Sequence, residues 1–250
     1  MKSFLTRGKF NSGIRARALL VPLLATLLLF SLDTPPVHGQ SDRTWHSHAR
    51  VARRVMKKFK SFNTYVANFN IRTKTGRRVR NMRGRLYFKK PNKVRYEFTV
   101  PRGNLMVSNG SILWIYIRRL NAAGKQDLKL KKKNDSKQFV FTGAPGSGLT
   151  RLFRKYHYRF DKPEQPRDEG GRSVYVLYMT QRERIGGYEN IKLYIDASTY
   201  LIRKAVAQDG DGKETEISFS RIRLNTPLDG SRFQFNVKNA RVVDNPLVNK

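Results

Sequence analysis

Apolar positions along the chain change their spacing near residue 61, which separates a helical part from a strand-rich part. Between Ser41 and Lys60 the apolar residues recur every three or four positions, and Arg and Lys occupy the opposite face. The repeating residues are Trp45, Ala49, Ala52, Val55, Met56 and Phe59. This period predicts one amphipathic helix over residues 41–60, with Ser41 or Asp42 as its N-cap.

From Asn63 onward the apolar residues alternate with polar ones or form short unbroken runs, which predicts strands. The predicted strands are 64–73, 79–89, 93–100, 103–108, 111–118, 126–132, 156–161, 172–180, 189–196, 200–208, 213–224 and 231–237. Asn109-Gly110 and Asp209–Gly212 stand between neighbouring runs, as is typical of tight hairpin turns. Because no helix alternates with the strands, we expect a single large antiparallel sheet in a mainly β (α+β) domain.

One stretch interrupts the strands. The segment 142–148 is rich in Gly and other small residues and is interpreted as a flexible hinge. The segment 149–155 predicts a short helix with Leu149, Leu152 and Phe153 on one side.

The predicted strands differ in how much cover they need. Val94, Tyr96 and Phe98 alternate with polar residues, whereas 112–117 and 174–179 are apolar on both sides and need both faces covered. About twelve strands exceed what a flat sheet usually carries, so the sheet is predicted to curl into an unclosed half-barrel. Its inner face is either filled by side chains or partly open as an apolar cavity for a lipid-like ligand. The pattern alone does not choose between the two.

The first 39 residues have the order of a secretory signal peptide. Bases within 1–17 precede an apolar run at 18–32, and small or compact residues precede a cut before Gln40. This run is shorter than the roughly 20 apolar residues that span a bilayer, although an uncleaved anchor is the alternative. We therefore expect a cleaved signal at 1–39 and a mature domain at 40–250 that works outside the cytoplasm.

The chain is strongly basic, with 51 Lys and Arg against 18 Asp and Glu and a formal net charge of +33. Nucleic acid is the usual partner of such charge, but it is not expected outside the cytoplasm. An anionic lipid surface is a better electrostatic partner. Solubility of the outer surface is an equal alternative.

Residue types that carry catalysis or bind metals are scarce. The chain has no Cys and four His, and it contains no GxSxG, HExxH or Walker pattern. Its Glu residues stand among bases and are interpreted as surface pairs. The sequence therefore predicts a protein that is not an enzyme and that uses no metal.

Three stretches carry a family resemblance. They are GRLYFKKPNKVRY at 84–96, VSNGSILWIY at 107–116, and LYIDASTYLIRK at 193–204, followed by Asp209, Thr215 and FQF at 233–235. In order and spacing, over roughly residues 44 to 240, they resemble the periplasmic lipoprotein carriers of the LolA family. The first is similar to that family's Gly-x-Leu-x-x-x-Arg/Lys-Pro-x-x-Phe/Leu-x-Trp/Tyr strand pair, and the second to its Val-Ser-Asp/Asn-Gly-x-x-Leu-Trp-x-Tyr hairpin.

The resemblance implies an unclosed antiparallel barrel with helices as a lid over an apolar cavity. Such carriers take acylated lipoproteins from an inner-membrane ABC transporter, shield the acyl chains across the periplasm and pass them to an outer-membrane acceptor. By this resemblance we expect a monomeric periplasmic chaperone that needs no cofactor.

The resemblance also assigns site residues. Val94 and Tyr96 match cavity residues of the family, and the predicted lipid-binding lining is Met56, Leu86, Phe88, Val94, Tyr96 and Phe98. Lys90 matches a basic residue that in many members is Arg and hydrogen-bonds the lid. The lid helix is expected at Leu149, Leu152 and Phe153. Because Lys lacks the planar fork of Arg, we expect lid locking here to be weaker or organised by another residue.

Some features depart from typical members and keep other classes open. The segment 118–133, with its lysines at 131–133, and the overall charge are unlike the family. RseB-type periplasmic sensors share the fold but add a second domain, whereas this chain ends at Lys250, soon after the last predicted strand. A basic surface-binding protein with a filled barrel is the other class, and salt would weaken its binding. Acyl-chain capture is instead expected to survive high salt.

Overall fold

The computed structural model describes residues 47–128, 147–183, 187–236 and 238–244, which lie in one compact unit spanning Thr44–Lys250. Within these ranges the α-helices are α1 (His48–Lys60) and α3 (Ser147–Lys155), and the 3-10 helices are η1 (Arg118–Leu120) and η2 (Gly230–Phe233). The strands are β1 (Thr64–Thr75), β2 (Arg78–Lys89), β3 (Lys93–Val100), β4 (Arg102–Ser108), β5 (Ile112–Ile117), β6 (Ala122–Asp127), β7 (Tyr156–Phe160), β8 (Arg167–Asp168), β9 (Ser173–Gln181), β10 (Tyr188–Asp196), β11 (Ile202–Asp209), β12 (Glu214–Leu224) and β13 (Arg241–Asp244).

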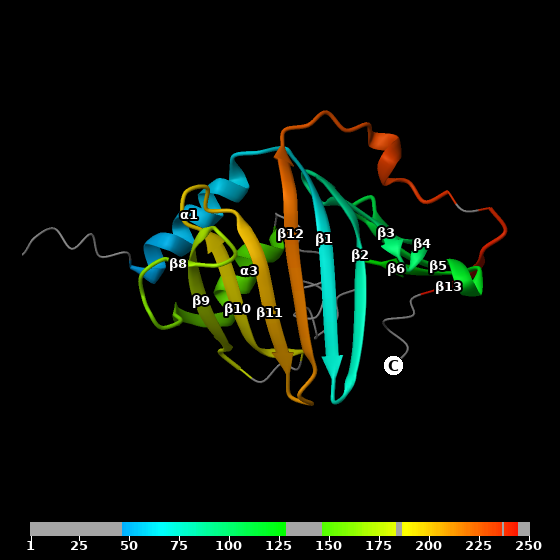
Figure 1. Cartoon of the computed structure of the whole chain (residues 1–250). Coiled ribbons are helices and arrows are strands. Elements are labelled where there is room, and N and C mark those ends of the chain that lie inside the picture. Colours follow the sequence, from blue (N-terminus) through cyan, green and yellow to red (C-terminus); the bar gives the residue numbers. More distant parts are fainter. Residues whose placement is uncertain (1–46, 129–146, 184–186, 237, 245–250) are drawn as a thin grey trace, which may run out of the picture. The chain divides into compact units, whose positions relative to one another are not determined.

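The described strands form one 13-stranded sheet in the order β13-β6-β5-β4-β3-β2-β1-β12-β11-β10-β9-β7, with β8 paired to β9. Neighbours pair antiparallel except β13 and β6, which are parallel. Among the described residues β13 and β7 are the two ends of this order, so the sheet is unclosed (Figure 1). The predicted fold is confirmed, with the difference that the sheet is mixed at its β13 edge.

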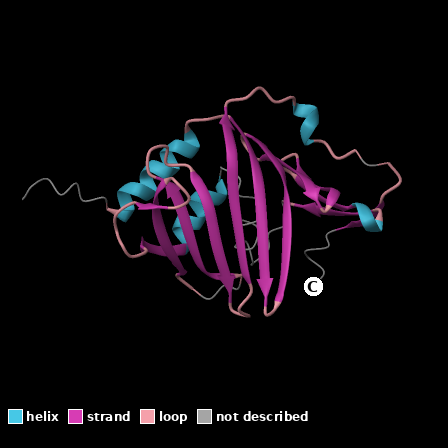
Figure 2. Cartoon of the chain, in the orientation of Figure 1, coloured by secondary structure: helices cyan, strands magenta, loops and turns pink. Residues whose placement is uncertain are grey.

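Both α-helices lie against the same face of the sheet, behind the strands in Figure 2. α1 and α3 contact each other, and each contacts β7. Buried residues of both helices belong to the same apolar cluster as side chains from the strands. We call this covered face the inner face and the opposite one the outer face.

The amphipathic pattern of α1 explains its position. Its buried residues are Val51, Ala52, Val55 and Phe59, and its last turn carries bases that suit the negative end of the helix dipole. The helix begins at His48 and not at Ser41 as predicted, because Ser47 is extended with a φ of −57° and a ψ of 130°. Ser41, Asp42 and Trp45 lie outside the described residues, as do the predicted signal segment and the hinge residues 142–146.

The strand predicted at 231–237 is wrong. Gly230–Phe233 is the 3-10 helix η2, in which Asp229 accepts a hydrogen bond from the Ser231 amide at 2.7 Å. Phe233 packs on the outer face against Val66 and Tyr87. The alternation of apolar residues here reflects a coil that packs on a sheet, and the last described strand is β13.

The strand predicted at 126–132 is displaced. Its observed counterpart β6 covers Ala122–Asp127, and residues 129–146 lie outside the described residues. The small residues Ala-Ala-Gly at 122–124 lie where β13 pairs with the edge of β6. The predicted strands 64–73, 79–89 and 93–100 agree with β1, β2 and β3 to within two residues.

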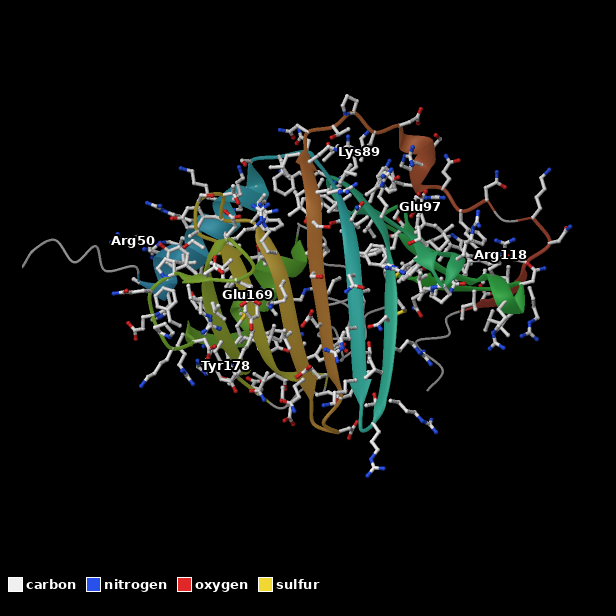
Figure 3. The ribbon with its side chains drawn as sticks, viewed as in Figure 1. Arg50, Lys89, Glu97, Arg118, Glu169 and Tyr178 are labelled. Carbon is white, nitrogen blue, oxygen red and sulfur yellow. The ribbon has the colours of Figure 1, made fainter. Side chains whose placement is uncertain are left out.

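Strands with apolar residues on both sides are covered by chain segments as well as by helices. On β5, Trp114 stacks on Phe235 with ring centroids 4.5 Å apart. On β9, Tyr178 is labelled in Figure 3. The Arg159 guanidinium lies 4.9 Å from the centre of its ring. Nonregular segments and long side chains thus protect apolar strand surface that α1 and α3 do not reach.

Asp196 organises the turn between β10 and β11. Its side chain is 5% exposed and accepts hydrogen bonds from the amides of Ser198 and Thr199 at 3.2 and 2.9 Å. Arg203 donates two bonds to the other carboxylate oxygen, at 3.1 and 3.2 Å. Burial raises the pKa of Asp196, but the bonds from Ser198, Thr199 and Arg203 outweigh it and hold this pKa well below its ordinary value.

We predict that Asp196 contributes to acid sensitivity. Because its pKa is lower in the folded than in the unfolded chain, its stabilisation is present above the unfolded value near 3.8 and is lost as the pH falls below it. Asp196→Asn should lower the free energy of unfolding at pH 7 by about 2 kcal/mol, since Arg203 loses its charged partner. Urea denaturation at several pH values measures both effects.

Asp211→Asn is the matched control, because Asp211 is exposed in the turn between β11 and β12. It should change stability little at any of these pH values. An Asp196→Asn protein as stable as wild type would contradict this account.

Candidate functional site

The inner face places the predicted lining residues of β2 and β3 side by side. Leu86 pairs with Tyr96, and Phe88 pairs with Val94. Their exposed fractions are 0, 0, 1 and 4% in that order, so none contacts solvent appreciably. All four belong to one apolar cluster that continues across the inner face.

The predicted lid residues of α3 close on this cluster. Leu149, Leu152 and Phe153 are 3, 4 and 6% exposed and pack into it. From α1 the buried contributions come from Val51, Ala52, Val55 and Phe59, whereas the predicted Met56 is only partly buried. The sequence pattern indicated the right helix, but the fully buried residue at this position is the neighbouring Val55 and not Met56.

An aromatic group lies at the β3 end of the cluster. The ring of Phe69 is in edge contact with Tyr96 at 4.9 Å and with Phe98 at 5.2 Å between centroids. Phe98 is partly buried and packs at the margin of the cluster. Five of the predicted lining residues are therefore brought together on the strands, with Phe98 at the border.

The Tyr96 hydroxyl is unusual in this setting. It is buried and has no hydrogen-bond partner among the described residues. Burial raises the pKa of Tyr96 well above its ordinary value, and the neighbouring Tyr65 adds to the rise, so the group is a neutral O–H. A buried polar group without a partner costs on the order of 1–3 kcal/mol. The site therefore holds one unused donor deep in an apolar surrounding.

Lys90 contacts the C-terminal end of α1. Its ammonium donates a hydrogen bond to the Lys60 carbonyl at 2.6 Å and lies 5.9 Å from the centre of the Phe62 ring. The Lys90 amide also donates to the Asn63 carbonyl at 2.9 Å. Lys90 thus fixes the C-terminal end of α1 and the chain that leads into β1.

Sequence reasoning missed the half of the inner face formed by β9 and β10. Leu177, Met179, Ile191 and Leu193 are all fully buried in the same cluster. Leu177 pairs with Leu193 and Met179 with Ile191 across the two strands. The apolar run at 174–179 and the alternation within 189–196 were the available signals for these residues.

The inner face offers apolar contact and little else. Among the described residues no three His, Asp or Glu side chains approach one another as metal ligands would. No described helix has the length and apolar character needed to cross a membrane. Because α1 and α3 cover the cluster, an apolar ligand can reach it only if these helices move away from the sheet.

Comparison with known proteins agrees with this geometry. The family model of the outer membrane lipoprotein carrier protein LolA matches residues 60–236. An outer-membrane lipoprotein carrier protein of Coxiella burnetii (strain CbuK_Q154) is 25% identical over 229 residues, which cover 90% of this chain and 96% of that protein. Its counterpart from Azotobacter vinelandii is 23% identical over 163 residues, or 65% of this chain and 72% of that protein.

A solved structure shows the same fold. The crystal structure of an uncharacterized conserved protein from Thermus thermophilus aligns with a TM-score of 0.53 at 16% identity, covering 78% of this chain and 98% of that chain. The match of the family model over most of the described sheet shows that the chain belongs to the LolA family of outer membrane lipoprotein carrier proteins.

Proposed function

We propose that this protein is a periplasmic carrier that holds the acyl chains of lipoproteins against the inner face of its sheet. The observation that carries the proposal is the single apolar cluster shared by the sheet and the two helices that cover it. In this view residues 1–39 direct export. An inner-membrane ABC transporter supplies the acylated protein and an outer-membrane acceptor receives it.

The inner face suits acyl chains energetically. Each methylene group removed from water contributes about 0.8 kcal/mol, so a chain of roughly ten or more is held firmly without a covalent bond. Leu86, Phe88 and Val94 provide apolar walls with no charged group among them. A carboxylate or ammonium group is costly in such a place, so the site favours the acyl part of the cargo over its polypeptide.

The cover is built so that it can detach. Side-chain hydrogen bonds of Arg54 and Lys90 link α1 to the rest of the unit. Arg54 donates to the Tyr200 hydroxyl at 2.6 Å, and Lys90 donates to the Lys60 carbonyl at 2.6 Å. The other contacts of α1 and α3 with the sheet are largely apolar. Acyl chains would replace these contacts with others of the same kind.

The Tyr96 hydroxyl supports a more specific role. Lipoprotein acyl chains are joined through ester and amide groups, whose carbonyl oxygens accept hydrogen bonds. A donor that lacks a partner in the covered site gains one when such a carbonyl enters. This would orient the head of the acyl chains near β3.

The proposal predicts that Val94→Glu abolishes acyl-chain capture, because it places a carboxylate in the apolar cluster. Native mass spectrometry with a triacylated lipoprotein and its unacylated form measures capture. Wild type should form a one-to-one complex with the acylated form alone, and this complex should persist at high ammonium acetate concentration.

Val79→Glu is the matched control, because Val79 is 47% exposed and the same charge there should leave capture unchanged. Circular dichroism tests whether both variants keep the sheet. A folded Val94→Glu protein that binds acylated cargo normally would refute the assignment of the inner face. A wild-type complex that forms equally with both cargo forms and dissociates in salt would refute the proposed function.

Tyr96→Phe should affect stability and capture in opposite directions. Removing the unpartnered hydroxyl should raise the free energy of unfolding by about 1 kcal/mol, whereas the affinity for acylated cargo should fall severalfold. Urea denaturation and a cargo titration measure the two quantities.

Tyr188→Phe is the control, because the Tyr188 hydroxyl already donates to the Thr215 hydroxyl at 3.3 Å. That substitution should lower stability and leave the affinity for cargo near that of wild type. Unchanged affinity in Tyr96→Phe would exclude a role for its hydroxyl in binding.

Lys90→Met should loosen the C-terminal end of α1, because the Lys60 carbonyl loses its donor. We expect severalfold faster amide hydrogen exchange in the last turn of α1 and faster uptake of acylated cargo. Lys89→Met is the matched control, since Lys89 donates to the Leu228 carbonyl at 2.7 Å on the other face. If both variants accelerate exchange in α1 equally, Lys90 has no specific role in holding the cover.

A further inference from the structure

The outer face of the sheet contains a groove whose lining combines arginine, amide and hydroxyl side chains with the aromatic residues Phe69, Tyr87 and Phe98. Two adjoining cavities of about 640 and 350 Å³ share Asn68 and Arg85. They open over β12, β1, β2 and β3, at the middle of the sheet. We call these two cavities together the outer groove.

Side chains from three neighbouring strands line the outer groove in rows. Strand register places Ser220, Asn68 and Arg85 in one row, and Ser218, Asn70 and Arg83 in the next. Each row therefore combines a hydroxyl, an amide and a guanidinium. All three groups donate hydrogen bonds, and together they suit an oxygen-rich anion.

The arginines of the outer groove are not neutralised within the described residues. Arg83, Arg85, Arg221 and Arg223 have exposed side chains and enter no ion pair or side-chain hydrogen bond there. The lining also contains one acid, Glu97, whose place on β3 is marked in Figure 3. Glu97 is already bonded by Arg95 at 2.7 Å and lies 3.8 Å from Arg232, so the groove keeps an excess of positive charge.

Two β-bulges shape the outer groove. The register of β1 with β12 shifts between Val66 and Asn68, where Arg221 adopts a φ of 50° that non-glycine residues rarely take. The register of β2 with β3 shifts at Gly84, where an added Cβ would lie 1.9 Å from the Glu97 carbonyl oxygen. Bulges redirect side chains and bend strands, so the hollow is a specific feature of this backbone and not charge spread over a flat sheet.

We propose that the outer groove binds a phosphate-bearing ligand. Guanidinium groups pair with phosphate oxygens through two parallel hydrogen bonds, and the Asn and Ser side chains supply neutral donors for the remaining oxygens. The arginines of the groove point to the face opposite the acyl-chain site, so a ligand bound to them does not block movement of the helices that cover that site. A soluble phosphate ester and a phospholipid headgroup present the same chemistry, and the experiment separates them.

The test compares two double variants that remove the same charge. Arg85→Gln with Arg223→Gln alters the outer groove, and Arg77→Gln with Arg78→Gln alters exposed arginines at the β1–β2 turn. Isothermal calorimetry with glycerol 3-phosphate measures the soluble ligand. Co-sedimentation with phosphatidylcholine vesicles, with and without phosphatidylglycerol, measures the headgroup.

The groove variant should bind at least about tenfold more weakly than wild type, and the turn variant within about twofold, because only the first loses charged hydrogen bonds to the ligand. Saturable binding of glycerol 3-phosphate identifies a soluble ester. Binding to phosphatidylglycerol vesicles alone identifies a headgroup. Equal weakening of both variants, or no saturable binding of either probe, overturns the proposal.

Two further measurements test the outer groove if the double variant unfolds and separate its role from the inner-face function. Asn70→Asp places a negative charge in the outer groove at an exposed position and should weaken phosphate binding even if the double variant unfolds. Acyl-chain capture by the groove variant should equal that of wild type, so failure of the outer groove is separable from failure of the inner-face function. Normal phosphate binding by Asn70→Asp overturns the assignment.

Discussion

The fold depends on how an unclosed sheet covers its apolar inner face. A closed barrel would bury this face against itself, whereas here the described order runs from β13 to β7 without joining. α1 and α3 supply the missing cover, and their apolar residues share one cluster with the strands. The unit is therefore stabilised by a contact between sheet and helices that involves few directed bonds.

This kind of contact makes an exchange of cover for ligand energetically reasonable. Burying a side chain such as Val51, Val55, Leu152 or Phe153 contributes about 1.5–3 kcal/mol, so four of them contribute about 6–12. An acyl chain of about ten methylene groups contributes about 8 kcal/mol on the same scale. On the proposed function, helices and acyl chains of similar worth would compete for one surface, so a small difference in affinity would shift the balance between them. No chemical step is required.

The sequence predicted the centre of the sheet well and its margins less well. In β1, β2 and β3 the alternation arises mainly from residues that face either the inner apolar cluster or the outer surface, and the observed bounds agree with the predicted ones to within two residues. At 231–237 the same alternation arises from a coil whose Phe233 and Phe235 pack on the outer face. Periodicity reports which side chains are buried, and it does not report whether the backbone pairs.

The candidate site was predictable in composition but not in its polar details. Leu86, Phe88, Val94 and Tyr96 are inward by simple alternation, which the strand register of β2 and β3 bears out. That the Tyr96 hydroxyl lacks a partner among the described residues, and that Lys90 bonds to the end of α1, depend on three-dimensional neighbours far away in the sequence. The proposed roles of Tyr96 in binding and of Lys90 in holding the cover both depend on these contacts.

The two faces of the sheet also explain how one strand set can serve two chemistries. Successive residues of a strand point to opposite sides, so Leu86 enters the apolar cluster while the adjacent Arg85 enters the outer groove. A slip of one residue would exchange the two and bury the charges. The bulges at Val66/Asn68 and Arg83/Gly84 change the outer surface without such an exchange, because each disturbs the pairing locally and the inward residues continue on both sides of it. The arginines of the outer groove are thus kept away from the apolar inner face, which retains the character that an acyl chain requires.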